Sequence, residues 1–167
     1  WVLLGQLTLR NSQPLPLDEI PELMQWALIS AEDGHFYDHE GIDFRAIART
    51  ALQNARSGET HGGSTITQQI VKKHVLTDEI TLERKICEAV IAARLEQLYT
   101  KDQILEFYMN SQFLGANAYG VKAAAQEYFG KELDQLTIAE AATIVVPIRG
   151  PNSFNPRKGS DEVVIRR

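Results

Sequence analysis

The residues best suited to acid–base chemistry stand together in residues 29–43, which read ISAEDGHFYDHEGID. Seven ionisable side chains occupy twelve consecutive positions there, directly after an apolar run: Glu32, Asp33, His35, Asp38, His39, Glu40 and Asp43. Carboxylates at the C-terminal end of a helix oppose its dipole, and locally unfavourable placements often coincide with functional sites. We interpret the stretch as a candidate acid–base site. The alternative is a solvated helix end with a few surface ion pairs.

A polar, glycine-rich loop over residues 57–64 leads into a predicted helix over residues 65–75. Glycines let the backbone approach a ligand closely, and the free N–H groups of a helix N-terminus attract anions. Lys72 lies two turns along that helix, roughly on the face of Thr65. The pattern favours a phosphate or pyrophosphate ligand, although the spacing does not fit a P-loop. A surface loop followed by a solvated helix is the alternative.

The longest predicted helix, residues 81–99, has two chemically distinct faces. At about 100° per residue, its apolar side chains gather on one side, while Arg84, Lys85 and Glu88 converge on the other. One interpretation is an exposed Arg84–Glu88 pair worth only a few tenths of a kcal/mol. The functional interpretation is a carboxylate held beside two cations that also face a phosphorylated substrate.

Composition and spacing exclude several other functions. The chain has 17 basic and 22 acidic residues and a net charge of −5, which argues against a general nucleic-acid binder. Its single cysteine, Cys87, rules out an internal disulfide. His35 and His39 are spaced for a shared metal, but the zinc-protease pattern requires a glutamate directly after the first histidine, where Phe36 stands. We therefore do not expect a zinc site.

The periodicity and the capping residues predict a mainly α chain that forms one domain. Residues 1–16 lack a helical period and are predicted to form an extended arm or a short strand. Candidate helix caps are Asp43, Thr65, Thr100 and Thr137. The predicted helices cover residues 17–31, 43–56, 65–75, 81–99, 100–109, 121–129 and 138–146.

Four blocks, in order along the chain, make the sequence similar to a known enzyme family. They are EDxxFxxHxG at residues 32–41, GGSTITQQIVK at 62–72, RKxxE at 84–88 and ILEFYMN at 104–110. Together they resemble glycosyltransferase family 51, the peptidoglycan glycosyltransferases of class A penicillin-binding proteins and their monofunctional relatives. Weaker matches continue to Pro156, so the resemblance covers most of the chain.

The resemblance implies a particular fold and location. Residues 1–167 would form a single mainly α glycosyltransferase domain, with a lysozyme-like head lobe and a smaller jaw lobe, roughly within residues 42–80, that faces the membrane. The chain would be a piece of a longer protein, anchored to the membrane by a segment it does not contain. That protein would act at the outer, periplasmic or extracytoplasmic face of the cytoplasmic membrane.

The resemblance also implies a reaction and roles for individual residues. Such enzymes are inverting hexosyltransferases, which polymerise lipid II into β-1,4-linked glycan strands and release undecaprenyl pyrophosphate. Glu32 would be the general base, and Glu88 would manage the pyrophosphate with Arg84, Lys85 and Lys72. The remaining residues predicted to bind substrate or to orient the site are Asp33, Phe36, His39, Gly63, Ser64, Thr65, Gln69 and Asn110.

The expected partners follow from the same resemblance. They are lipid II and the growing glycan strand, the cytoplasmic membrane surface, and a fused transpeptidase domain or other cell-wall synthesis proteins, with no nucleic acid. No cofactor is obligatory, and Mg²⁺ or Mn²⁺ near Glu88 is left open. Two alternatives remain: a lysozyme-like lytic transglycosylase or glycosidase, and a non-catalytic module that binds lipid II. The cations at Lys72, Arg84 and Lys85 argue against a lytic enzyme, which has no pyrophosphate to hold.

Overall fold

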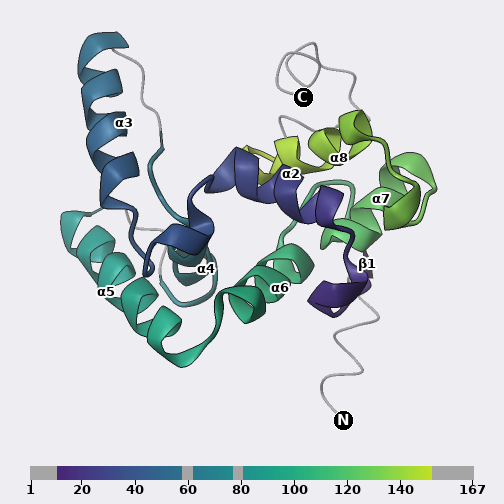
Figure 1. The fold of residues 1–167 in the computed structure, drawn as a ribbon, viewed down its shortest axis with the longest axis horizontal. Helices are drawn as coiled ribbons and strands as arrows, with labels where there is room; N and C mark the ends of the chain where they lie inside the picture. Colours follow the sequence, from purple (N-terminus) through teal and green to yellow (C-terminus); the bar gives the residue numbers. More distant parts are fainter. Residues whose placement is uncertain (1–10, 58–61, 77–80, 152–167) are drawn as a thin grey trace. The chain divides into compact units, whose positions relative to one another are not determined.

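The fold was obtained as a computed structural model, which describes residues 11–57, 62–76 and 81–151. The chain is mainly α, as the sequence predicts (Figure 1). It divides into two compact units: Trp1–Ala31 together with Leu105–Arg167, and Glu32–Ile104. Residues 42–80, which were predicted to form a smaller lobe, all belong to the second unit, which extends beyond them on both sides. None of the described helices is long and apolar enough to cross a membrane.

The first unit combines short helices with one pair of very short strands. Strand β1 runs parallel to β2, with Asn11 opposite Ala118 and Ser12 opposite Tyr119. Two helices, α2 and α6, continue across the boundary into the second unit. The elements are β1 (Asn11–Ser12), η1 (Leu17–Glu19), α2 (Glu22–Glu32), α6 (Lys101–Ser111), β2 (Ala118–Tyr119), α7 (Val121–Phe129), η3 (Leu133–Gln135), α8 (Ile138–Val145) and η4 (Val146–Arg149).

The buried residues of the first unit are almost all apolar. Helix α7 contacts both short strands as well as η3 and α8, and three consecutive alanines let these elements approach closely. Among the buried residues, only Gln112 and Thr143 are polar in the described part of this unit. The unit therefore has an ordinary hydrophobic core and few groups for chemistry.

The second unit is built from η2 (Phe36–Asp38), α3 (Phe44–Ser57), α4 (Ile66–His74) and α5 (Leu82–Leu98). The predicted cap at Asp43 is confirmed, because its Oδ1 accepts from the N–H of Ala46 at 2.9 Å. Thr65 and Gln68 form the predicted capping box at the start of α4, which packs against α5. Most buried residues that are polar or charged belong to this unit: Asp33, Asp43, Thr65, Thr67, Gln68 and Glu88.

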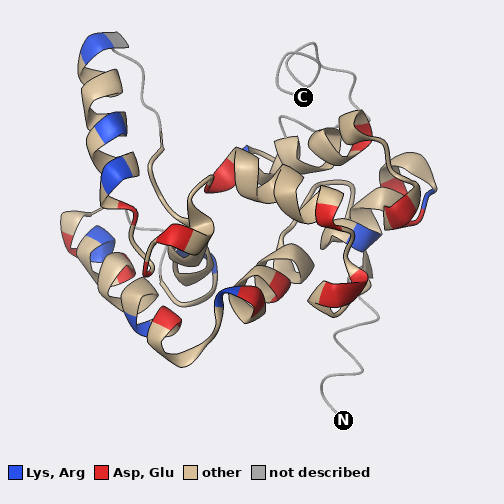
Figure 2. Ribbon diagram, viewed as in Figure 1, with Lys and Arg blue, Asp and Glu red and all other residues tan. Residues whose placement is uncertain are grey.

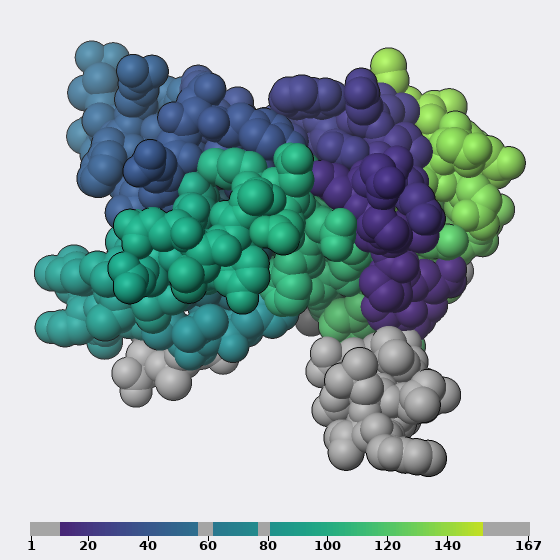
Figure 3. All heavy atoms as spheres, turned by 60° about the horizontal axis from the view of Figure 1, so that its bottom comes forward, coloured from purple at the N-terminus to yellow at the C-terminus, as the bar shows by residue number. Residues whose placement is uncertain are grey.

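The apolar faces of α3 and α5 are directed outward rather than into a core. Phe44 on α3 is 73% exposed, and Leu82 and Ile86 on α5 are 73% and 56% exposed. Figure 3 shows α3 (blue) and α5 (teal) on one face of the molecule. The interpretation of Arg84 and Glu88 as an exposed surface pair is wrong, because α5 buries this charged face instead.

Two predicted helices differ from the observed ones at prolines. The helix predicted over residues 17–31 is a short 3₁₀ turn followed by α2, with Pro21 directly before the first residue of α2. Pro21 has no N–H to continue the turn that precedes it, so the two elements are separate. The helix predicted to stop before Pro147 instead continues as η4, where Pro147 occupies an early position that needs no N–H donor.

Candidate active site in the second unit

Glu32, the predicted base, is the last residue of α2 and is half-buried. Its Oε2 accepts a hydrogen bond from Nε2 of Gln69, on α4, at 2.9 Å. Lys73 lies within electrostatic reach on the same helix. The pKa of Lys73 falls below its usual value because desolvation of its ammonium outweighs the attraction of the Glu32 carboxylate. Glu32 thus interacts with a neutral donor and with a cation, both supplied by α4.

Asp33 joins the segment that follows α2 to the start of α4. Its buried carboxylate accepts from the N–H of Ile66 at 3.0 Å and contacts Nε2 of His39 at 3.0 Å and 3.1 Å. A carboxylate at a helix N-terminus satisfies a free N–H and complements the helix dipole. Phe36, fully buried, packs edge-to-face on His39. These contacts fix the segment that follows Glu32.

Gly41 lies where the same segment crosses α5. Its φ is +85°, and an added Cβ would stand 2.8 Å from backbone atoms of Ala92 and Ala93. Its carbonyl accepts from Oγ1 of Thr65 at 2.7 Å, which ties the segment to the N-cap of α4 as well. Only glycine combines this backbone conformation with such a close approach.

We predict that Gly41→Ala lowers the free energy of unfolding by about 2–4 kcal/mol, the sum of backbone strain and a steric clash. Gly34→Ala is the matched control, since no atom lies within 4 Å of a Cβ built there. Its free energy of unfolding should stay within about 0.5 kcal/mol of the parent value. Urea denaturation followed by circular dichroism compares the two, and equal stabilities would contradict the prediction.

Arg84, Lys85 and Glu88 form an ion cluster on α5 around a buried carboxylate. Glu88 is 1% exposed, its Oε2 accepts from Nη1 of Arg84 at 2.8 Å, and its Oε1 accepts from Nζ of Lys85. Lys85 also donates to Oγ of Ser64 at 2.7 Å, so the cluster reaches the loop that precedes α4. The side chain of Lys85 remains 44% exposed, whereas Nε of Arg84 is buried without a partner among the described residues. An unsatisfied buried donor beside an accessible ammonium suits an anionic ligand.

The groups around Glu88 are cationic rather than acidic. Both oxygens of Glu88 already bond cationic groups, with which a metal ion would have to share the carboxylate and which would repel it. Within the described ranges, no three histidine, cysteine or acidic side chains are grouped so as to hold a metal ion. Mg²⁺ or Mn²⁺ at Glu88 therefore gains no support from this geometry.

The structure places most of the predicted site residues together in the second unit. The loop before α4 and that helix itself carry Gly63, Ser64, Thr65, Gln69 and Lys72. Gly63 approaches Thr50 of α3, and Lys72 is exposed in the last turn of α4.

Asn110 is different, because it belongs to the first unit. Its amide group bonds the backbone of Leu15 in both directions, at 3.0 Å and 2.7 Å. The residues that sequence reasoning missed are Thr67, Glu96 and Lys101, which form a chain of contacts that ends at His39 and carry no spacing signal of their own.

Comparison with known proteins assigns this chain to a family. The sequence profile of the family described as Transglycosylase matches residues 2–167. The chain belongs to the transglycosylase family. Residues 32–88, which include most of the candidate site, lie well inside the match.

Several relatives of this transglycosylase are named penicillin-binding protein 1A. The protein of Escherichia coli K12 is 48% identical over 166 residues, which cover 99% of this chain and 20% of that protein. The protein of Rickettsia bellii is 44% identical over 157 residues, covering 92% of the chain and 20% of that protein. The protein of Aquifex aeolicus is 43% identical over 166 residues, which cover 99% of this chain and 23% of that protein. The chain spans about a fifth of the length of these relatives.

Proposed function

We propose that this transglycosylase is an inverting peptidoglycan glycosyltransferase that polymerises lipid II and releases undecaprenyl pyrophosphate. Family membership and the names of the relatives support a role in building the glycan of the cell wall. The proposal rests on one further observation. Helix α4 and the loop before it contact both a half-buried carboxylate, through Gln69 and Glu32, and a cation cluster, through Ser64 and Lys85.

A glycosyl transfer of this kind requires both groups. Glu32 takes the proton from the 4-hydroxyl of the acceptor sugar as that oxygen attacks the anomeric carbon of the donor. The bond from that carbon to the pyrophosphate oxygen breaks, and the pyrophosphate leaves with the bonding electron pair. Because attack and departure occur on opposite faces, the configuration inverts. Lys85 and Nε of Arg84 stabilise the negative charge that develops on the leaving group.

Glu88 acts on this reaction through its neighbours. Its carboxylate is 1% exposed and is fully engaged by Arg84 and Lys85, so its role is to hold both cations in place. Two adjacent cations repel each other, and a buried carboxylate between them removes most of that repulsion. The cations are then fixed before the charge of the leaving group appears, which is the condition for electrostatic catalysis.

Fluorescent lipid II in detergent, with products separated on a gel, tests the proposal. A ladder of long glycans supports polymerisation. Incubation with purified cell-wall sacculi tests the lytic alternative, because only a lytic enzyme releases soluble fragments from them. Binding of lipid II without any ladder would instead indicate a module that captures the substrate and does not turn it over.

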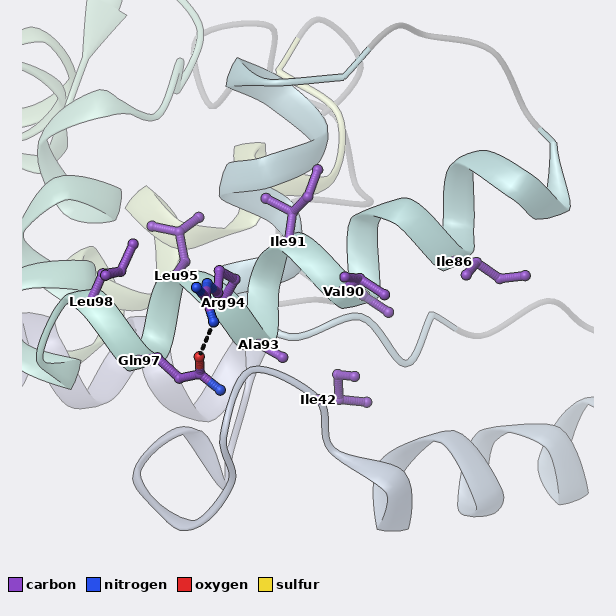
Figure 4. A pocket seen from close by; sticks show the side chains of 10 residues that line it. Ile42, Ile86, Val90, Ile91, Ala93, Arg94, Leu95, Gln97 and Leu98 are labelled. Carbon is purple, nitrogen blue, oxygen red and sulfur yellow. Dashed lines mark hydrogen bonds between the residues drawn. The ribbon is translucent and has the colours of Figure 1, made fainter.

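We further propose that α3 contacts the membrane surface that carries this substrate. Its exposed apolar side chains include Phe44, Ile47 and Leu52, and its only charged residues are arginines (Figure 2). Next to it, a groove of about 850 Å³ lies between α5 and the segment before α3. Ile42 faces Ile86 and Val90 across this groove (Figure 4). A helix that combines an apolar face with cationic side chains suits an anionic lipid interface.

The double substitution Phe44→Ser/Ile47→Ser should weaken binding to vesicles of anionic phosphatidylglycerol roughly 10- to 100-fold, because two side chains no longer bury their surface in lipid. Ile138→Ser is the matched control, since Ile138 is an equally prominent apolar residue, 75% exposed, in the first unit. Vesicle co-sedimentation measures both. Undiminished binding of the double variant would show that α3 does not make the lipid contact.

A further inference from the structure

A chain of buried polar contacts runs from the junction of α5 and α6 to the segment that follows Glu32. Glu96, near the end of α5, accepts from Oγ1 of Thr67 at 2.5 Å and pairs with Nζ of Lys101 at 2.7 Å. The side chains of Glu96 and Lys101 are only 5% and 20% exposed. Burying such a pair is costly unless its geometry is well satisfied, so it calls for an explanation beyond a surface contact.

Lys101 of this pair also contacts His39. Its Nζ lies 3.4 Å from Nδ1 of His39 and 4.4 Å from the centre of the Phe36 ring. An ammonium has no lone pair, so Nδ1 of His39 must be the acceptor in this contact. The imidazole hydrogen is then on Nε2, where it is donated to Asp33 at 3.0 Å. Lys101 and Asp33 therefore favour the same tautomer of His39, and Lys101 holds the Nδ1 side of the ring.

Asp33 connects His39 to the proposed base. It directly follows Glu32 and accepts from the N–H of Ile66, the first residue of α4. The same helix carries Gln69, which holds the Glu32 carboxylate at 2.9 Å. All of these contacts lie within the second unit. The chain from Glu96 to Asp33 thus fixes the loop and the helix between which Glu32 is oriented.

We propose that Lys101 and Glu96 are positioning residues for the Glu32 base, acting through the orientation of the His39 ring. This inference rests on the proposed function of the site. Neither residue touches the reacting atoms, so their loss slows the chemical step without weakening the binding of lipid II. A pair that merely stabilises the junction of two helices would change unfolding and leave the turnover of the folded enzyme unaltered.

The test replaces both charges at once, as Glu96→Gln/Lys101→Met, so that no buried charge is left unpaired. The expected result is a fall in kcat of roughly 30-fold, with KM for lipid II changed by less than about twofold, as for a base displaced from its productive geometry. The matched control is Glu140→Gln/Lys131→Met, the same chemical change at a 2.7 Å pair in the first unit. Circular dichroism confirms that each variant is folded at the assay temperature.

A double-mutant cycle with His39→Leu shows whether the pair acts through His39. The combined variant should be no slower than His39→Leu alone, because the pair has nothing left to position. Losses that multiply, an unchanged kcat in the folded double variant, or an equal loss in the control would overturn the proposal.

The side-chain nitrogens of His39 provide a readout that does not depend on turnover. ¹⁵N NMR of the imidazoles, with His39 assigned through His39→Leu, should show one Nε2–H tautomer in the parent chain, and a shifted Nδ1 resonance in Glu96→Gln/Lys101→Met, where Nδ1 has lost its donor. A mixture of tautomers in the parent chain overturns the proposal. This readout is informative even if the parent chain makes no glycan from lipid II, in which case the proposed function fails and the hydrogen-bond chain is still tested.

Discussion

Replacing Glu32 with glutamine should abolish polymer formation while leaving the fold intact. Glutamine keeps the shape of the side chain, and its carbonyl oxygen still accepts the hydrogen bond from Gln69 that Glu32 accepts at 2.9 Å. It cannot take a proton from the acceptor hydroxyl, a function worth about 10²–10⁴-fold in rate. With fluorescent lipid II, the parent chain should give a ladder of glycans, and Glu32→Gln should give none.

The control for this substitution lies on the same helix. Glu22→Gln makes the same chemical change at the opposite, exposed end of α2 and should leave the ladder unchanged. Thermal unfolding of the three proteins shows whether either change affects the fold. A normally active Glu32→Gln protein would remove Glu32 from the role of base and would point to another group on α4 or in the loop before it.

The local order of the second unit was predictable because its helix starts are encoded by neighbouring residues. Asp43 accepts from the N–H of Ala46 at 2.9 Å, and Thr65 forms a reciprocal capping box with Gln68. Such contacts join residues only three positions apart, so the sequence contains all the information they need. The same holds for Gly130, whose left-handed conformation (φ +64°) ends α7 where predicted.

Which face of α5 is buried was not predictable in the same way. Periodicity separates its apolar side from the side of Arg84 and Glu88, but it cannot say which side is buried. The usual expectation is that the apolar side packs inward. The structure instead buries Glu88 and exposes Leu82 at 73%, because Ser64 and the two cations supply the polar contacts that a buried carboxylate requires. Burial of this kind depends on partners distant in sequence.

The residues that surround His39 illustrate the same limit. Phe36 and His39 belong to a compact motif, so their grouping with Asp33 could be inferred from seven consecutive positions. Lys101 reaches His39 from 62 positions away along the chain, and Glu96 accepts from Thr67 across 29 positions. In the sequence, both appear as ordinary charges near the ends of helices. Only the packing of α4 and α5 shows that they belong to one network.

Lys85→Met should reduce the rate of glycan formation by about 10²–10³-fold, the usual cost of losing one group that stabilises developing negative charge. Methionine preserves much of the aliphatic stem of lysine but removes the ammonium that bonds Ser64 and Glu88. Arg84 still compensates the buried Glu88 carboxylate at 2.8 Å, so the helix should remain folded. Single-turnover release of undecaprenyl pyrophosphate from lipid II measures the effect on the chemical step.

The matched control is Lys122→Met, which removes an ammonium from a surface pair with Glu132, 3.8 Å apart, in the first unit. Because a solvent-exposed pair contributes little, this variant should react at the parent rate. Adding Mg²⁺ should not restore Lys85→Met, since a divalent ion would have to share the Glu88 carboxylate with Arg84. A full rate in Lys85→Met, or its recovery with Mg²⁺, would mean that a metal ion rather than the lysine stabilises the leaving pyrophosphate.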